Sequence, residues 1–266
     1  MERVESASTV AEALDAAQRA VMDRVLAEEQ ARREHVVVYL SGAHAYGFPS
    51  PDSDLDLKAI HVASTADLLG LEPPTMTFDR AEVIDGVEID YTSNELAHAL
   101  TGILAGNGNF IERVLGRMVP LASPLLDELR PIVRRSLSRR AHKHYRGFAQ
   151  NQVRELAKQP TAKKLLYVLR TTLTGIHLLE TGELEPDLSR VMDAYGIADA
   201  AALIEQKRAG ERVALDVTMR DAWTPRVDAL LRRLDEARET SPLPESPPNE
   251  EEIRAWLVGV RRSRLL

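Results

Sequence analysis

The segment LSGAHAYGFPSPDSDLDLKAIHV, which runs from Leu40 to Val62, decides how this chain folds. Three aspartates, Asp52, Asp54 and Asp56, alternate with other residues directly after a glycine-containing stretch. The apolar residues that separate and follow the aspartates indicate the start of a strand rather than a solvated loop. Because residues two apart on a strand point to the same face, Asp54 and Asp56 bring two carboxylates close together.

Two neighbouring carboxylates repel each other, and one of them takes up a proton unless a cation neutralises the pair. A hard divalent cation with oxygen ligands, Mg²⁺ or Mn²⁺, is the natural partner. An EF-hand calcium loop is excluded, because Leu57 stands where the sharp turn needs glycine and Ala63 where the loop needs glutamate. A pair of aspartates also serves metal-dependent sugar transferases, which stay a distant alternative because this chain has little α/β sequence for a nucleotide sugar.

The composition is that of an ordinary globular protein, with 266 residues of which 44% are hydrophobic and 28% charged. We expect no membrane span, since no apolar run is long enough, and no secretory signal, since the first residues are acidic. The absence of cysteine excludes disulfides and fits the cytoplasm. With a net charge of −7, the molecule could bind nucleic acid only through a local basic patch.

The two halves of the chain differ in their predicted secondary structure. The first half alternates helix and strand patterns: a helix over 11–30, strands over 35–40 and 54–62, a hairpin turning at Asp85-Gly86, and a helix over 93–106. From about Ser123 onward the strand signals fade and helical segments follow one another. We predict an α/β or α+β domain over 1–120, a helical domain over 121–240, and a linker with a C-terminal helix over 241–266.

The order of strand, glycine turn, short helix and aspartate strand resembles the polymerase-β-like nucleotidyltransferase superfamily. Gly42 and Ala43 are followed by ten residues and then by Asp54-Leu55-Asp56, which fits the superfamily spacing. The stretch GAHAYGFPSPDSDLD is similar to one branch, the YcgL-like predicted nucleotidyltransferases associated with RNA repair. The resemblance implies an α+β fold, with a small mixed sheet in the N-terminal nucleotidyltransferase domain and a C-terminal helical bundle.

The resemblance also implies roles for individual residues. Asp54 and Asp56 would hold two Mg²⁺ or Mn²⁺ ions, and the third carboxylate would come from a later strand, where VEIDY supplies Asp90, with Glu88 in reserve. The glycine turn of Ser41, Gly42 and Ala43 would bind the triphosphate. The family usually has serine or glycine at the position of Ala43, but backbone N–H donors do not depend on that side chain.

A basic stretch from Arg130 to Arg146 holds seven lysines or arginines and no acid. Read as one continuous helix, it places Arg135, Arg139 and Arg146 on one face, which predicts a phosphate-binding or RNA-binding surface. The alternative is a basic face that pairs with the acidic first domain. On the following helix, Lys163 and Arg170 are weaker candidates for contacts with the triphosphate.

These observations predict a Mg²⁺-dependent nucleotidyltransferase that binds an NTP such as ATP and transfers NMP to a hydroxyl, most naturally an RNA end, with release of pyrophosphate. A protein side chain or a small molecule could be the acceptor at the same site. A non-catalytic nucleotide- or RNA-binding module is the alternative from another class, and Ala43 is the feature that favours it. The sequence does not determine the oligomeric state.

Overall fold

The computed structural model describes residues 9–72, 74–210 and 214–265, and these form two compact units. The first, which we call the sheet unit, contains residues 9–42, 54–136 and 247–265. The second, which we call the helical unit, contains residues 43–53 and 137–246. The described part of the chain has no helix with both the length and the hydropathy to cross a membrane.

A mixed five-stranded sheet forms the centre of the sheet unit, with strand order β3-β4-β2-β1-β5. Strands β2 and β4 are parallel, and the other neighbouring pairs are antiparallel. The strands are β1 (Glu34–Leu40), β2 (Leu55–Val62), β3 (Thr77–Ile84), β4 (Val87–Glu95) and β5 (Leu121–Ala122). The helices of this unit are α2 (Ala16–Gln30), α4 (Thr65–Leu69), α5 (Leu96–Leu104), α6 (Gly108–Leu115), α7 (Pro124–Ser136) and α13 (Glu250–Arg262). The predicted α+β class with a small mixed sheet is confirmed.

Local sequence explains most of these elements. The β-branched run in β1 is buried almost throughout, as expected for a central strand. The predicted hairpin between β3 and β4 is confirmed: Asp85 and Gly86 have φ values of 49° and 83°, which a two-residue primed turn requires. The predicted helix over 93–106 begins later than expected, because β4 continues through Ser93 and Glu95 caps α5.

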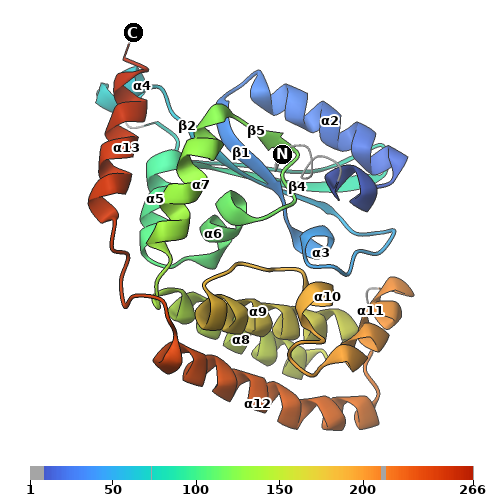
Figure 1. The fold of residues 1–266 in the computed structure, drawn as a ribbon. Coiled ribbons are helices and arrows are strands. Elements are labelled where there is room, and N and C mark those ends of the chain that lie inside the picture. The colour runs from blue at the N-terminus through green and yellow to red at the C-terminus, as the bar shows by residue number, and fades with distance from the viewer. Residues whose placement is uncertain (1–8, 73, 211–213, 266) are drawn as a thin grey trace. The chain divides into compact units, whose positions relative to one another are not determined.

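Both faces of the sheet are covered by helices (Figure 1). Helix α2 lies along one face, while α5, α6 and α7 pack on the other. On the second face, Arg113 of α6 donates to the carbonyl of Ala59 on β2, 3.0 Å away. Gly116, just after α6, packs so closely on Tyr39 that a Cβ there would lie 2.5 Å from the ring.

The C-terminal helix α13 belongs to the sheet unit, although residues 137–246 of the helical unit separate it from α7 in sequence. It packs beside α5 and α7. Arg261 pairs with the fully buried Glu95 at the end of β4, and Trp256 donates to Glu128 of α7 at 3.0 Å. These contacts tie the end of the chain to the sheet.

The helical unit is built around α9 (Ala162–Thr181), which α8, α10, α11 and α12 contact. Its other elements are α8 (Ala141–Lys158), α10 (Leu188–Val191), a 3₁₀ turn (Ala198–Ala200), α11 (Ala201–Arg208) and α12 (Val217–Thr240), while α3 (Gly42–Ala45) begins at the junction of the units. Gly175 allows α9 to approach α8, since a Cβ on it would lie 2.7 Å from Cβ of Tyr145. Helix α9 ends where Gly182 adopts φ 76°.

The single helix predicted through the basic stretch is wrong. The chain forms α7 and α8 with a break over 137–140. In the break, the N–H of Arg139 donates to the carbonyl of Pro244 at 2.8 Å instead of continuing the helical ladder. A tertiary hydrogen bond therefore replaces the helical one, and the three predicted arginines do not share one helix face.

Candidate active site

Asp56 and Asp90 lie directly opposite each other on two neighbouring parallel strands. Asp56 is the second residue of β2, and its register partner on β4 is Asp90. Neighbouring strands are about 5 Å apart, and partners in register point to the same face of the sheet. Asp54 precedes β2 by one residue, and its charge is close enough to raise the pKa of Asp56. The structure thus gathers the carboxylates that the sequence singles out.

A lysine lies between two of these carboxylates. The Nζ atom of Lys58 is 2.8 Å from Oδ2 of Asp90 and 3.6 Å from Oδ1 of Asp56, and it also donates to the Asp90 carbonyl at 3.2 Å. Lys58 was not predicted from the sequence, but a signal was present. It continues the alternation of Asp54 and Asp56 by two more residues and so falls on the same face.

The electrostatics of Asp56 fit a cation site. Burial, reinforced by the neighbouring charge of Asp54, raises the pKa of Asp56 to about 6, and Lys58 opposes that rise. Within the described residues, no group of three or more His, Cys, Asp or Glu side chains is already arranged as a metal site. The oxygen donors nevertheless suit Mg²⁺ or Mn²⁺.

Gly42 packs its backbone against the carboxylate of Asp56. It adopts φ +64°, and a Cβ on it would lie 2.0 Å from Oδ2 of Asp56. The preceding residue, Ser41, donates its N–H to the carbonyl of Asp56 at 2.8 Å. Both the left-handed backbone and the close approach require glycine here. The turn and the first aspartate strand are thus fixed to each other.

Of the remaining residues predicted for the triphosphate, two lie at this turn and two lie on α9. Ala43 is buried in α3, and Ser41 is half-buried between β1 and the turn. Lys163 and Arg170 belong to α9 of the helical unit. The guanidinium of Arg170 lies over the ring of Tyr46, 3.5 Å from its centroid, and is itself buried. Contacts of these residues with a triphosphate stay a prediction.

The three arginines predicted to bind RNA each have a partner inside their own unit. Arg135 on α7 pairs with Glu252 of α13. Arg139 donates to the carbonyls of Ser241 at 2.6 Å and Leu243 at 2.9 Å. Arg146 donates to Asp235 of α12 at 2.9 Å, and His142 contacts the same carboxylate. Pairing within each unit accounts for part of the positive charge of the basic stretch over 130–146. A role in RNA binding stays a prediction.

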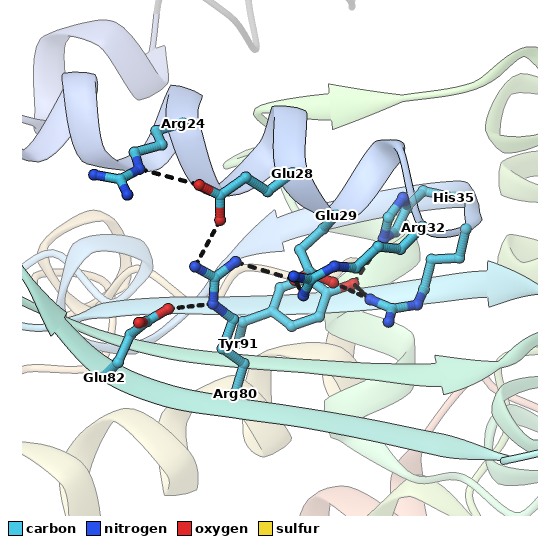
Figure 2. Close-up of polar contacts among 9 residues, drawn as sticks. Arg24, Glu28, Glu29, Arg32, His35, Arg80, Glu82 and Tyr91 are labelled. Carbon is cyan, nitrogen blue, oxygen red and sulfur yellow. Dashed lines mark hydrogen bonds and ion pairs between the residues drawn. The ribbon is translucent and has the colours of Figure 1, made fainter.

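On the opposite face of the sheet, a network of charged residues joins α2 to β3 and β4 (Figure 2). Glu29 of α2 is buried and accepts from Arg32 at 2.8 Å and from Arg80 of β3 at 3.1 Å. Arg33 donates to the hydroxyl of Tyr91 at 3.1 Å, and His35 contacts that hydroxyl at 2.7 Å. Since Tyr91 follows Asp90 in β4, this network holds the strand on the face opposite to the Asp90 side chain.

Comparisons with known proteins place this geometry in context. The sequence model of the RNA repair pathway DNA polymerase beta family, RlaP, matches residues 17–259. An uncharacterized protein from Methanocaldococcus jannaschii is 31% identical over 178 residues, which are 65% of this chain and 72% of that protein. The crystal structure of a nucleotidyltransferase-like protein from Exiguobacterium sibiricum aligns with 91% of this chain and 79% of its own, at 12% identity and a TM-score of 0.32. The family match begins in α2, ends in α13 and includes every candidate site residue named above.

Proposed function

The chain belongs to the RNA repair pathway DNA polymerase beta family, and on that premise we propose that it is a metal-dependent nucleotidyltransferase. The reaction transfers NMP from an NTP to an acceptor hydroxyl and releases pyrophosphate. One observation carries the proposal: Asp56 and Asp90 are register partners on parallel strands, and the Gly42 turn packs against the Asp56 carboxylate. A glycine turn beside clustered carboxylates is suited to a nucleotide bound with divalent cations.

Asp54, Asp56 and Asp90 would hold two Mg²⁺ or Mn²⁺ ions. When bound, the ions neutralise phosphate charge and lower the pKa of the acceptor hydroxyl. The protein's own contribution is positional, as in other phosphoryl-type transfers. Asp56 is held by the ladder of β2 and by the Gly42 turn, and Asp90 by the ladder of β4.

Lys58 has two roles in this proposal. While no cation is bound, its ammonium group neutralises Asp56 and Asp90, which are otherwise adjacent like charges. If the carboxylates held cations, the Lys58 ammonium would be available to contact a phosphate of the nucleotide. The flexible four-carbon stem of lysine permits such a contact without a change in the strand.

The triphosphate would contact the turn at Ser41, Gly42 and Ala43. The N–H of Ser41 is engaged with the Asp56 carbonyl, so the next two residues would contribute the backbone N–H groups. Lys163 and Arg170 remain the candidate side chains for the phosphates.

Arg135 of the sheet unit and Arg139 and Arg146 of the helical unit remain the candidates for RNA contacts, each considered within its own unit. Arginine is suited to this task, because its guanidinium group can donate two hydrogen bonds to one phosphate. The family name supports an RNA end as the acceptor, because it places the family in an RNA repair pathway.

A non-catalytic nucleotide- or RNA-binding module is the second candidate, favoured by Ala43 at a position that could hold a phosphate-binding hydroxyl. The two candidates are separated by incubating the protein with Mg²⁺, each α-labelled NTP, and separate pools of RNA, protein and small molecules. The enzyme proposal expects label in one pool, and expects it to be lost in Asp54→Asn and Asp56→Asn. Binding of nucleotide without transfer to any pool would favour the module.

A further inference from the structure

The segment that joins the glycine turn to the first aspartates, residues 43–53, packs in the helical unit rather than with the sheet. We call it the connecting segment. The carbonyl of Tyr46 accepts from the N–H of Leu188 at 3.0 Å, and Arg170 stacks on the Tyr46 ring. Gly47, with φ +84°, lies so close to Asp187 that a Cβ would be 1.9 Å from its Oδ1. Residues of α9 and α10 therefore hold the first half of the segment.

A fully buried lysine holds the second half. Lys207 of α11 has 0% of its surface exposed, and its Nζ donates to Oγ of Ser50 at 2.6 Å and to Oγ of Ser53 at 2.8 Å. The two hydroxyls are 3.1 Å apart, and the N–H of Ser53 donates to the carbonyl of Ser50 at 2.9 Å. The hydrogen bond with Ser50 is the main cause that lowers the pKa of Asp52, and the positive charge of Lys207 lowers it further.

Ser53 is the residue immediately before Asp54. On the other side of Asp54, Leu55 is already fixed in β2, where its register partner is Ile89. Both neighbours of Asp54 are thus fixed, Leu55 by the sheet ladder and Ser53 by the contact of its hydroxyl with Lys207. Burying an ammonium group costs free energy that an apolar side chain of the same size would not cost. A lysine at this place therefore points to a task beyond filling space.

We propose that Lys207 is a positioning residue for the carboxylate site: it orients Asp54 by fixing Ser53 and the turn that Ser53 makes with Ser50. The inference rests on the proposed function, because Asp54 is a cation ligand only there. The positioning residue lies more than 150 positions away in sequence from the two serines that it contacts.

The test compares Lys207→Met and Ser53→Ala with wild type in the full-length protein. Lys207→Met keeps the length of the side chain and removes the ammonium group. We expect Mn²⁺ affinity, measured by electron paramagnetic resonance of the free ion, to fall about tenfold in both variants. We also expect kcat for NMP transfer to fall while KM for the NTP changes little, because the phosphate-binding backbone of the turn is not altered.

Ser241→Ala is the matched control. Its hydroxyl is buried in the same unit and donates to the carbonyl of Leu179 at 2.5 Å, away from the connecting segment. This variant should lower the melting temperature and leave Mn²⁺ affinity at the wild-type value. If Lys207→Met does not fold, Ser53→Ala decides the matter, since it removes only one hydroxyl.

A folded Lys207→Met or Ser53→Ala with wild-type Mn²⁺ affinity and kcat would overturn the positioning role. A wild-type protein that neither binds Mn²⁺ nor transfers NMP would instead overturn the proposed function. The two failures are distinguishable because the first requires an active wild type. A loss of Mn²⁺ affinity in Ser241→Ala equal to that in Ser53→Ala would also count against a specific role for Lys207.

Discussion

The Cα of Gly42 faces the carboxylate of Asp56 so closely that no side chain fits between them: a Cβ would lie 2.0 Å from Oδ2. The turn and the aspartate strand therefore form one structural feature, although residues 43–55 separate Gly42 from Asp56 in sequence. The contact explains why a glycine with φ +64° begins α3.

The first prediction follows from that contact. Gly42→Ala should destabilise the protein by at least about 1–3 kcal/mol, because it combines left-handed backbone strain with a clash at Asp56. It should also abolish NMP transfer. Gly86→Ala is the matched control: it has φ +83° but nothing within 4 Å of a Cβ, so it should lose some stability and keep activity. Equal activity in both variants would contradict a functional contact between Gly42 and Asp56.

The second prediction concerns the charge of Asp56 in the protein freed of divalent metal. Because its pKa is raised from 3.8 to about 6, the folded state holds a proton more tightly than the unfolded state, and stability falls as pH rises through that window. Asp56→Asn should therefore raise the free energy of unfolding at pH 8 by on the order of 1–3 kcal/mol, while transfer is lost. Chemical denaturation in EDTA at pH 4 and pH 8 measures this.

The increase in the free energy of unfolding that Asp56→Asn gives at pH 8 should disappear near pH 4, where the wild-type carboxyl is already protonated. Asp52→Asn is its control, because hydrogen bonding to Ser50 lowers the pKa of Asp52. That variant should show no gain at pH 8. A gain in Asp52→Asn, or none in Asp56→Asn, would show that burial and the charge of Asp54 do not raise the pKa of Asp56.

The third prediction concerns Lys58. Replacing it by methionine removes the ammonium group between Asp56 and Asp90, so Mn²⁺ in the absence of nucleotide should bind about tenfold more tightly, a change of about 1.4 kcal/mol. The metal-free protein should lose stability at the same time. Lys158→Met, which removes an exposed lysine paired with Glu155, should change neither. Unchanged Mn²⁺ affinity in Lys58→Met would mean that the lysine does not compete with the cation.

The fourth prediction concerns RNA. Arg135 is the most exposed of the three candidate arginines and pairs with Glu252 at the surface of the sheet unit. Arg135→Gln should weaken RNA binding and reduce the slope of log affinity against log salt by about one unit. Glu252→Gln is the opposite change: it removes the competing carboxylate and should strengthen RNA binding. Fluorescence titrations at several salt concentrations measure both.

Arg139 and Arg146 require a different comparison, because their internal hydrogen bonds are partly buried. Arg139→Gln and Arg146→Gln should lower the melting temperature as well as any RNA affinity. If all three single variants bind RNA with the wild-type salt slope while folded, the reason for proposing these arginines as RNA contacts is gone.

The fifth prediction is a pH dependence set on the opposite face of the sheet. Burial is the main cause that lowers the pKa of His35 and of His61 to about 4. Both must lose a proton to fold, so their contribution to stability is present above pH 6.5 and is lost as pH falls toward 4. Each should add up to about 1.4 kcal/mol per pH unit to the slope in that window.

Denaturation curves between pH 4 and 7.5 measure this slope. His35→Gln and His61→Gln should each make it shallower, whereas the matched control His98→Gln, which replaces an exposed histidine, should leave it unchanged. His35 contacts the hydroxyl of Tyr91, and His61 that of Ser93, so the variants also test how firmly β4 is held. If all three variants kept the wild-type slope of stability against pH, the assignment of that slope to His35 and His61 would be contradicted.

The sequence by itself determined the features that depend on local rules. Alternation along a strand predicts that Asp54 and Asp56 share one side, and Asp85-Gly86 predicts the hairpin, because each follows from backbone geometry within a few residues. The resemblance of the segment from Gly42 to Asp56 to polymerase-β-like nucleotidyltransferases indicated the fold, and the family match confirms that resemblance.

Only the tertiary structure decided which side chains meet across the fold. That Asp90 is the register partner of Asp56 depends on how two strands align, and a shift by one residue would have turned Asp90 to the other face. The break between α7 and α8 depends on the hydrogen bond from Arg139 to the carbonyl of Pro244. The position of Ser53 depends on the hydrogen bond from Lys207 to its hydroxyl. The last two contacts join residues more than 100 positions apart, and no local pattern of hydrophobicity or charge specifies any of the three.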